Sequence, residues 1–333
     1  MLEVYPAALL SSVPVLLRVY WVLAAGAAVF ALLPLNVAPS FRAAVVLSAC
    51  RGKTWDSKPA ARLGPLTGLS VPQSWFAHFY DVGAAVNAAV LGSLLALAAN
   101  SGSLGSMAAD GASDAALAGL ALLQAHLTRR LAEANWLACY PAGARMHAIA
   151  YLFGLSYYVV LPLSLLPDEL WQRLGEGAWP ARAPAAPALL ARARCAAAAQ
   201  PPIALLGAAV FLVGNALQLH SHWLLARLRP AQPRKPGPDV SLSEGPAADA
   251  GDGDYSVPRG GAFALVSCPH YLAEIVIYAG LAMVAGRARL QPWLVLTWVV
   301  ANLLLAAGPT HAWYRRRFKD YPASRRAIIP YVY

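Results

Sequence analysis

Ionisable side chains lie inside a strongly apolar segment in the last third of the chain. His270 and Glu274 are four residues apart, so on a helix they would point the same way. Titratable groups at membrane depth are costly, and they usually line a pocket or a pathway. The Glu274 carboxylate could accept hydrogen bonds from ribose hydroxyls or an amide, or it could simply pair with a neighbouring arginine. This segment is therefore the first place to look for chemistry.

Another polar turn lies nearer the N-terminus, at the end of an apolar run. Its members are His126, Arg129, Arg130 and Glu133. Arg130 could bind a phosphate, but an arginine at this place could equally well extend its charged end to the membrane interface.

His78 and Asp81 lie one helical turn apart within an aromatic stretch. A carboxylate at this spacing could hold the imidazole protonated or in one tautomer. A belt of interfacial aromatic residues with one incidental histidine would explain the same pattern. Both interpretations stay open at this point.

Gln218 and His222, four residues apart, share one helix face. Polar residues on one stripe of a membrane helix indicate a ligand-filled interior, although hydrogen bonding between helices would also explain them. His220 and His222 point in nearly opposite directions, so they cannot chelate one metal ion together. The cysteines Cys50, Cys139, Cys195 and Cys268 show no C-x-x-C spacing. Neither a metal site nor a disulfide framework is expected.

The composition is that of an integral membrane protein. Of 333 residues, 59% are hydrophobic and only 13% are charged, and the mean hydropathy is +0.50. A soluble chain of this size would not stay in solution with such a balance. The net charge is +10, and much of it lies near the C-terminus. Without a basic soluble domain, this excess indicates a cytosolic flank of the membrane and not a nucleic-acid site, while an anionic ligand stays possible.

Apolar runs near the length of a spanning helix predict an all-α protein with about seven transmembrane helices. The expected spans are Val13–Leu35, Phe76–Ala99, Ala115–Cys139, Met146–Leu166, Ile203–Leu225, Ala262–Ala285 and Leu290–Gly308. The first run has no basic segment before it and no clear cleavage site, so we expect a retained anchor and not a signal peptide.

The Lys and Arg residues between the spans predict the orientation. The connection after the first span is basic, whereas Asn100–Asp114 has no Lys or Arg. This places the N-terminus on the lumenal side and the basic C-terminal tail in the cytosol. The arginines in Pro167–Gln200 argue weakly against this orientation. Most of the polar positions fall towards the cytosolic half, so they could converge on one cytosol-facing cavity.

Two sets of motifs extend over much of the chain. The C-terminal set reads Tyr255-x-x-Pro258-x-Gly260-Gly261-x-Phe263-x-x-Val266-Ser267-x-Pro269-x-Tyr271-x-x-Glu274, then His311-x-Trp313-Tyr314-x-x-x-Phe318-x-x-Tyr321-Pro322-x-x-Arg325. This set resembles the C-terminal domain of the steroid 5α-reductase family. The second set comprises Arg51-Gly52-Lys53-Thr54, Phe76-x-His78-Phe79-Tyr80, His126-x-x-Arg129-Arg130-Leu131-x-Glu133 and Phe153-Gly154-Leu155-x-Tyr157-Tyr158. It is similar to the type 3 branch of that family, the polyprenol (polyprenal) reductases.

The resemblance implies a seven-helix endoplasmic reticulum enzyme that reduces a carbon–carbon double bond with NADPH. We expect an anchor and cytosolic loop in 1–74, substrate-side helices in 75–229 and a cofactor-binding domain in 255–333. The resemblance does not extend to 230–254, where a composition rich in Pro, Gly, Ala and Asp predicts a disordered insertion. The positions where it implies cofactor contacts are Arg130, Gln218, His222, Arg229, Tyr255, His270, Glu274, His311, Tyr314 and Arg325.

The chain departs from the steroid enzymes at two places. Their Gln-Glu pair appears here as His78-Phe79, and their proton-donating tyrosine falls at Leu127. Hydride adds readily to a double bond conjugated with a carbonyl, because the charge can spread onto oxygen. We therefore expect the long-chain aldehyde polyprenal as substrate, with His78 polarising its oxygen and Tyr80 or Glu133 as further acids.

The sequence thus predicts an NADPH-dependent polyprenal reductase on the way to dolichol, which supports N-glycosylation. Its expected partners are a polyisoprenoid substrate and membrane lipid, with no nucleic acid and no obligate protein partner. The alternatives with the same fold are a steroid 5α-reductase and a trans-enoyl-CoA reductase. A lipid-binding or transport protein would also place polar groups inside a helical bundle.

Overall fold

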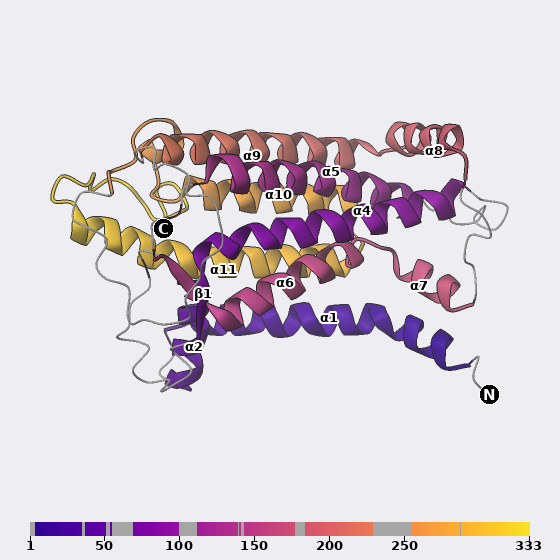
Figure 1. Cartoon of the computed structure of the whole chain (residues 1–333), viewed down its shortest axis with the longest axis horizontal. Helices are drawn as coiled ribbons and strands as arrows, with labels where there is room; N and C mark the ends of the chain where they lie inside the picture. Colours follow the sequence, from indigo (N-terminus) through magenta and orange to yellow (C-terminus); the bar gives the residue numbers. More distant parts are fainter. Residues whose placement is uncertain are drawn as a thin grey trace.

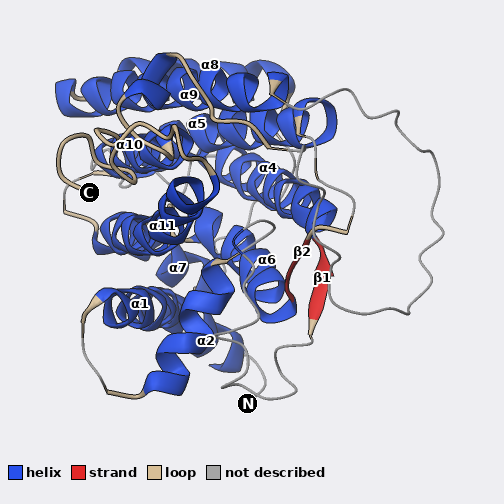
Figure 2. Cartoon of the chain, turned by 90° about the vertical axis from the view of Figure 1, so that its left-hand side faces the viewer, coloured by secondary structure: helices blue, strands red, loops and turns tan. Residues whose placement is uncertain are grey.

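The computed structural model describes residues 4–34, 37–50, 54, 69–99, 112–138, 140, 143–176, 184–228, 255–286 and 288–333. Long helices run side by side along the long axis of the molecule (Figure 1). Figure 2, which looks at the bundle from one end, shows α9, α5 and α10 grouped on one side and α1 and α2 on the other. Arg229 and the expected insertion at 230–254 lie outside the described residues.

In the described part of the chain, one helix lies in each of the seven apolar ranges that hydropathy predicts. These helices are α1 (Val4–Leu32), α4 (Ala77–Ala99), α5 (Ala112–Ala132), α6 (Ala148–Leu163), α9 (Pro202–Arg227), α10 (Pro269–Ala285) and α11 (Leu290–Arg317). The shorter helices are α2 (Pro39–Ala49), α7 (Asp168–Gly175) and α8 (Ala186–Ala198), with single turns at η3 (Gln73–Phe76), η4 (Glu133–Leu137) and η5 (Gly261–Ala264).

Four helices in the described part of the chain are long and apolar enough to cross a membrane, namely α1, α4 with its preceding turn η3, α9 and α11. The pair α6 and α7, bent by 84° at a short break, would make a fifth span. The apolar helix α10 has only 17 residues. It begins at Pro269, later than the range expected from Ala262, because η5 precedes it and a proline fits the first turn of a helix. The chain is thus a mostly helical, multi-pass membrane protein.

Glycines let α9 and α10 approach closely. A Cβ atom on Gly214 would lie 2.8 Å from Ile277 Cγ1, and one on Gly280 would lie 2.5 Å from the carbonyl oxygen of Gly207. Small residues at helix contacts are the usual means of close packing in membranes. This contact places Gln218 of α9 beside Glu274 of α10.

The break between α6 and α7 exposes carbonyl groups that need donors inside the protein. Arg289 donates from Nη1 to the carbonyl oxygen of Leu165 at 2.8 Å and from Nη2 to that of Leu166 at 2.5 Å. Trp21 of α1 is fully buried and donates from Nε1 to the Ser164 hydroxyl at 2.8 Å. These bonds fasten α1 and α11 to the break.

A short antiparallel ladder aligns α4 and α6. In it β1 (Ser70–Pro72) pairs with β2 (Arg145–His147), with Val71 opposite Met146. The strand β1 directly precedes η3, which leads into α4, and the strand β2 directly precedes α6. The ladder therefore fixes the starts of both helices. His147 then caps α6, since its Nδ1 accepts from the backbone N–H of Ile149 at 3.2 Å.

Candidate functional site

A cavity of about 610 Å³ is lined mainly by residues of α1, α2, α4, α5, α6, α9, α10 and α11. The polar residues on its wall include Tyr80, Arg130, Glu133, Gln218, His222, Tyr255, His270, Glu274 and Tyr314. Aromatic and aliphatic residues form most of the rest of the wall. A wall that carries both polar clusters and apolar side chains suits an amphipathic ligand.

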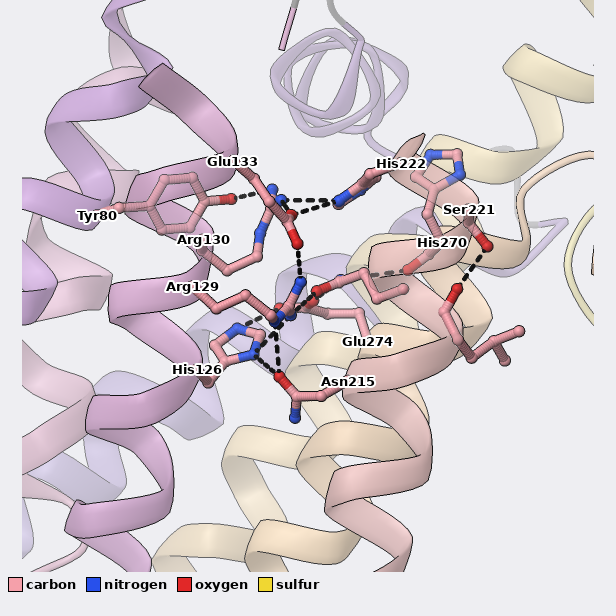
Figure 3. Close-up of polar contacts among 12 residues, drawn as sticks. Tyr80, His126, Arg129, Arg130, Glu133, Asn215, Ser221, His222, His270 and Glu274 are labelled. Carbon is pink, nitrogen blue, oxygen red and sulfur yellow. Dashed lines mark hydrogen bonds and ion pairs between the residues drawn. The ribbon is translucent and has the colours of Figure 1, made fainter. Parts of the chain in front are cut away.

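The first polar cluster on the wall, the Glu133 cluster, consists of Tyr80, Arg130, Glu133 and His222 (Figure 3). Arg130 donates from Nη2 to the Tyr80 hydroxyl at 2.6 Å and forms an ion pair with Glu133. His222 Nδ1 lies 2.7 Å from Glu133 Oε2. Glu133 is 6% exposed, so its negative charge is stabilised mainly by these partners and by an ion pair with Arg129.

The second group, the Glu274 cluster, consists of His126, Arg129, Asn215, Gln218 and Glu274, and it lies beside the first (Figure 3). The Gln218 amide donates to Glu274, and its oxygen accepts from Arg129. Asn215 Oδ1 accepts from Arg129 Nε at 3.0 Å and lies 3.0 Å from His126 Nδ1. His126 Nε2 lies 3.8 Å from Glu274 Oε1.

The two clusters together hold two arginines and two glutamates. In the described part of the chain, both arginines pair with Glu133, whereas the contacts of Glu274 are with Gln218 and His126. Within the residues that the structure describes, Glu274 therefore keeps a carboxylate at the cavity wall that forms no ion pair with an arginine.

The C-terminal segment packs against the cavity through a column of aromatic rings. Tyr314 lines the cavity and stacks on Tyr321 at 5.4 Å between ring centroids. The Arg325 guanidinium carbon lies over the Tyr321 ring, 5.1 Å from its centroid. Arg325 is 4% exposed, and its Nε and Nη1 find no hydrogen-bond partner among the described residues. A buried guanidinium with open donors is suited to an anionic group.

Ser267 connects this segment to the cavity wall. Its hydroxyl lies 2.6 Å from His311 Nδ1 and 2.6 Å from the Tyr321 hydroxyl. Ser267 lines the cavity, whereas His311 and Arg325 stand behind the wall. The structure thus brings nine of the predicted cofactor and acid residues to one cavity and places these two next to it.

Among the predicted acids, His78 is the one that does not line the cavity. Its side chain is exposed, and its Nδ1 lies 2.9 Å from the Tyr151 hydroxyl. Its ring also packs beside Trp75, at 5.6 Å between centroids. Residues two apart on a helix face opposite sides, so His78 points outwards where Tyr80 points inwards. The interpretation as an interfacial aromatic group fits this placement, and polarisation of a substrate by His78 does not.

Small and aromatic side chains form an apolar part of the cavity wall, which we call the apolar arm. Ala24, Ala27 and Ala28 of α1 lie on its wall, with Phe153 of α6 and Trp298 of α11. The alanines leave room that larger residues would fill, so this arm can hold a chain-like apolar ligand.

Asn215 is the cluster member that the sequence reasoning missed. It precedes Gln218 by three residues and His222 by seven, so all three lie on one stripe of α9. Extending the stripe of Gln218 by one turn would have found it. Which side chains it meets on α5 depends on how the two helices face each other.

Comparisons with known proteins agree over most of the chain. A family model described as 3-oxo-5-alpha-steroid 4-dehydrogenase matches residues 246–333. The chain is 32% identical to polyprenal reductase 1 of Arabidopsis thaliana over 94% of this chain and 95% of the relative. It is 31% identical to polyprenal reductase 2 of Oryza sativa subsp. japonica over 85% of this chain and 86% of the relative. It is 30% identical to the polyprenal reductase of Xenopus tropicalis over 80% of this chain and 82% of the relative.

Proposed function

Because the chain belongs to the polyprenal reductase branch of the steroid 5α-reductase family, we propose that it reduces the α-isoprene double bond of polyprenal with NADPH. The saturated aldehyde formed is a step towards dolichol, which supports protein N-glycosylation. We place the enzyme in the endoplasmic reticulum membrane. The observation that carries the proposal is one cavity whose wall combines arginine-containing polar clusters with the alanines of α1.

The polar residues on and next to the cavity wall fit a phosphorylated dinucleotide. Arg130 lies on the wall, and the open donors of Arg325 lie behind Tyr314 and Tyr321. Tyr255, His222 and His270 add hydrogen-bonding groups, and Glu274 adds a carboxylate that could accept from ribose or amide groups. When bound, NADPH supplies the hydride. In this proposal these side chains hold and orient the cofactor.

Tyr80 is the best placed acid for the aldehyde oxygen. In its contact with Arg130 the hydroxyl accepts, so its own hydrogen can be donated into the cavity. Negative charge develops on the aldehyde oxygen when an unsaturated aldehyde is reduced, and a fixed donor stabilises it. The positive charge of Arg130 beside the hydroxyl favours this donation. Glu133 is engaged by Arg129, Arg130 and His222, so we assign it the role of orienting Arg130 and not that of the acid.

We further propose seven spans and a cavity whose polar mouth faces the cytosol. Support comes from Arg315, Arg316 and Arg317, which end α11 beyond the cavity-lining Tyr314. Basic residues flank the cytosolic ends of spans more often than the lumenal ends. On this view 255–333 supplies much of the cofactor site, and 75–229 supplies the substrate side.

Isotope transfer from the cofactor tests the proposal. Purified protein in detergent is given polyprenal and NADPH that carries deuterium at C4 of the nicotinamide, and the product is analysed by mass spectrometry. We expect one deuterium at the β-carbon and one solvent proton at the α-carbon. Deuterium at the aldehyde carbon, or no reduction, would contradict the proposal.

A further inference from the structure

His126 is a buried titratable residue for which the proposed reaction has no direct use. Its side chain is 1% exposed, and it does not line the cavity. Its ring lies between Phe211, at 6.2 Å, and Tyr278, at 6.4 Å, between centroids. Burying an imidazole in an apolar bundle is costly unless its nitrogens find partners.

The two ring nitrogens meet different surroundings. Nδ1 lies 3.0 Å from Asn215 Oδ1 and 3.2 Å from Arg129 Nη2, so this side is held by a fixed amide and a guanidinium. Nε2 is fully enclosed and makes no hydrogen bond to a described residue. The carboxylate oxygen Oε1 of Glu274 lies 3.8 Å from Nε2.

Matching of donors and acceptors assigns a hydrogen to Nε2. A carboxylate only accepts, so an Nε2 without hydrogen would place two acceptors opposite each other in a site that excludes water. The contact of Nδ1 with Arg129 is consistent with a neutral ring whose hydrogen is on Nε2. The contact of Nδ1 with Asn215 is consistent with a charged ring that carries both hydrogens. In either state Nε2–H faces Glu274.

Glu274 depends on the contact with His126 because Arg129 and Arg130 form their ion pairs with Glu133. Both Arg129 and Arg130 pair with Glu133, and the other contact of Glu274 within the described residues is the Gln218 amide. Gln218 holds Oε2, which leaves His126 to attract Oε1. We propose that His126 is a positioning residue that holds the Glu274 carboxylate towards the cavity so that it can accept hydrogen bonds from the cofactor. This inference rests on the proposed function for the identity of the ligand.

Two conservative variants test the Nε2 contact and the Nδ1 contact of the His126 ring separately. In His126→Gln the amide nitrogen can occupy the place of Nε2 and donate to Glu274. In His126→Asn the shorter amide can occupy the place of Nδ1 and keep the contact with Asn215, but it does not reach Glu274. If His126 mattered only for packing, His126→Gln would not be expected to bind NADPH more tightly than His126→Asn.

The measurement is the equilibrium dissociation constant of NADPH, obtained by fluorescence quenching of the full-length protein in detergent. His126→Asn and Glu274→Gln should each weaken binding by about tenfold, as expected when the hydrogen bond from the cofactor to the charged Glu274 carboxylate is lost. His126→Gln should stay within about threefold of the original protein. The double variant of His126→Asn and Glu274→Gln should be no weaker than the weaker single variant, because the two changes break one interaction.

Three results would overturn the inference. The first is a double variant in which the two losses of NADPH affinity multiply. The second is a dissociation constant of His126→Asn equal to that of the original protein, and the third is an equal loss of affinity in His126→Gln and His126→Asn. If the original protein does not bind NADPH, the proposed cofactor is wrong. The pair is then judged from thermal unfolding of the ligand-free variants, where non-additive losses support the contact and additive losses refute it.

Discussion

Arg130 donates a hydrogen bond from Nη2 to the Tyr80 hydroxyl at 2.6 Å, and this contact joins α5 to α4 at the cavity wall. The direction of the bond matters, because a guanidinium can only donate. Tyr80 is therefore left with its own hydrogen to donate, next to a fixed positive charge. A phenol in this position can stabilise negative charge on a bound carbonyl oxygen.

The change Tyr80→Phe removes the hydroxyl and keeps the ring. We expect kcat for polyprenal reduction to fall by about 100- to 1,000-fold, because a donor to the developing oxyanion is lost. The dissociation constant of NADPH should stay within about twofold, since the loss falls on the transition state. Steady-state kinetics and cofactor titration measure the two quantities.

The matched control for Tyr80 is His78→Ala, two residues earlier on α4. His78 is exposed and contacts Tyr151 outside the cavity, so kcat should change by less than about twofold. A large loss of kcat in His78→Ala, with kcat unchanged in Tyr80→Phe, would show that the acid lies on the His78 side of α4 and that our assignment to Tyr80 is wrong.

Glu133 is the counter-ion of Arg129 and Arg130 inside the bundle. The change Glu133→Ala leaves these charges uncompensated, so we expect the free energy of unfolding to fall by about 3 to 5 kcal/mol. Thermal unfolding in detergent would show this as a lower midpoint.

The ion pair of Arg259 with Asp320 serves as the comparison for Glu133. Its side chains are 65% and 70% exposed, so water already solvates both charges. The change Asp320→Asn should leave the midpoint of unfolding nearly unchanged, because exposed pairs contribute little. Equal shifts in the two variants would show that Glu133 is not a buried counter-ion.

Ala24 lies on the wall of the apolar arm. The change Ala24→Phe should narrow this arm and raise the KM for long-chain polyprenal by about tenfold. An aldehyde with three isoprene units, which needs less of the arm, should be affected much less. Kinetics with the two aldehydes measure the difference.

Val22, on the same helix, provides the control for Ala24. It is 52% exposed and does not line the cavity, so Val22→Phe should leave both KM values unchanged. Similar effects of Ala24→Phe on both chain lengths would show that the isoprenoid does not lie along α1.

Hydropathy located the long apolar helices, because each apolar run must satisfy its own backbone hydrogen bonds in lipid, but it did not predict α2, α7 and α8 in the connections. In the structure α9 spans Pro202–Arg227, within a few residues of the range Ile203–Leu225 that hydropathy predicts. Hydropathy was less informative for α10, where the apolar range begins at Ala262 but the helix begins at Pro269. Apolar character alone does not distinguish a 3-10 turn from the helix that follows it.

The site could be predicted only in part. The spacing of Gln218 and His222 on α9, and of His270 and Glu274 on α10, correctly indicated shared faces that line one cavity. The pattern around His78 did not reveal which side of α4 faces inwards, because both sides carry aromatic residues there. Packing against α6 decides this, and such packing depends on contacts between residues far apart in the sequence.

The most direct test of the account is the oxidation of NADPH by the purified protein when polyprenal, polyprenol and a 4-en-3-one steroid are offered side by side. We predict rapid oxidation with polyprenal and little with the other two, since the alcohol offers no conjugated carbonyl and the rigid steroid does not fill the chain-like apolar arm. Reduction of the steroid with polyprenal left unchanged would contradict the central claim.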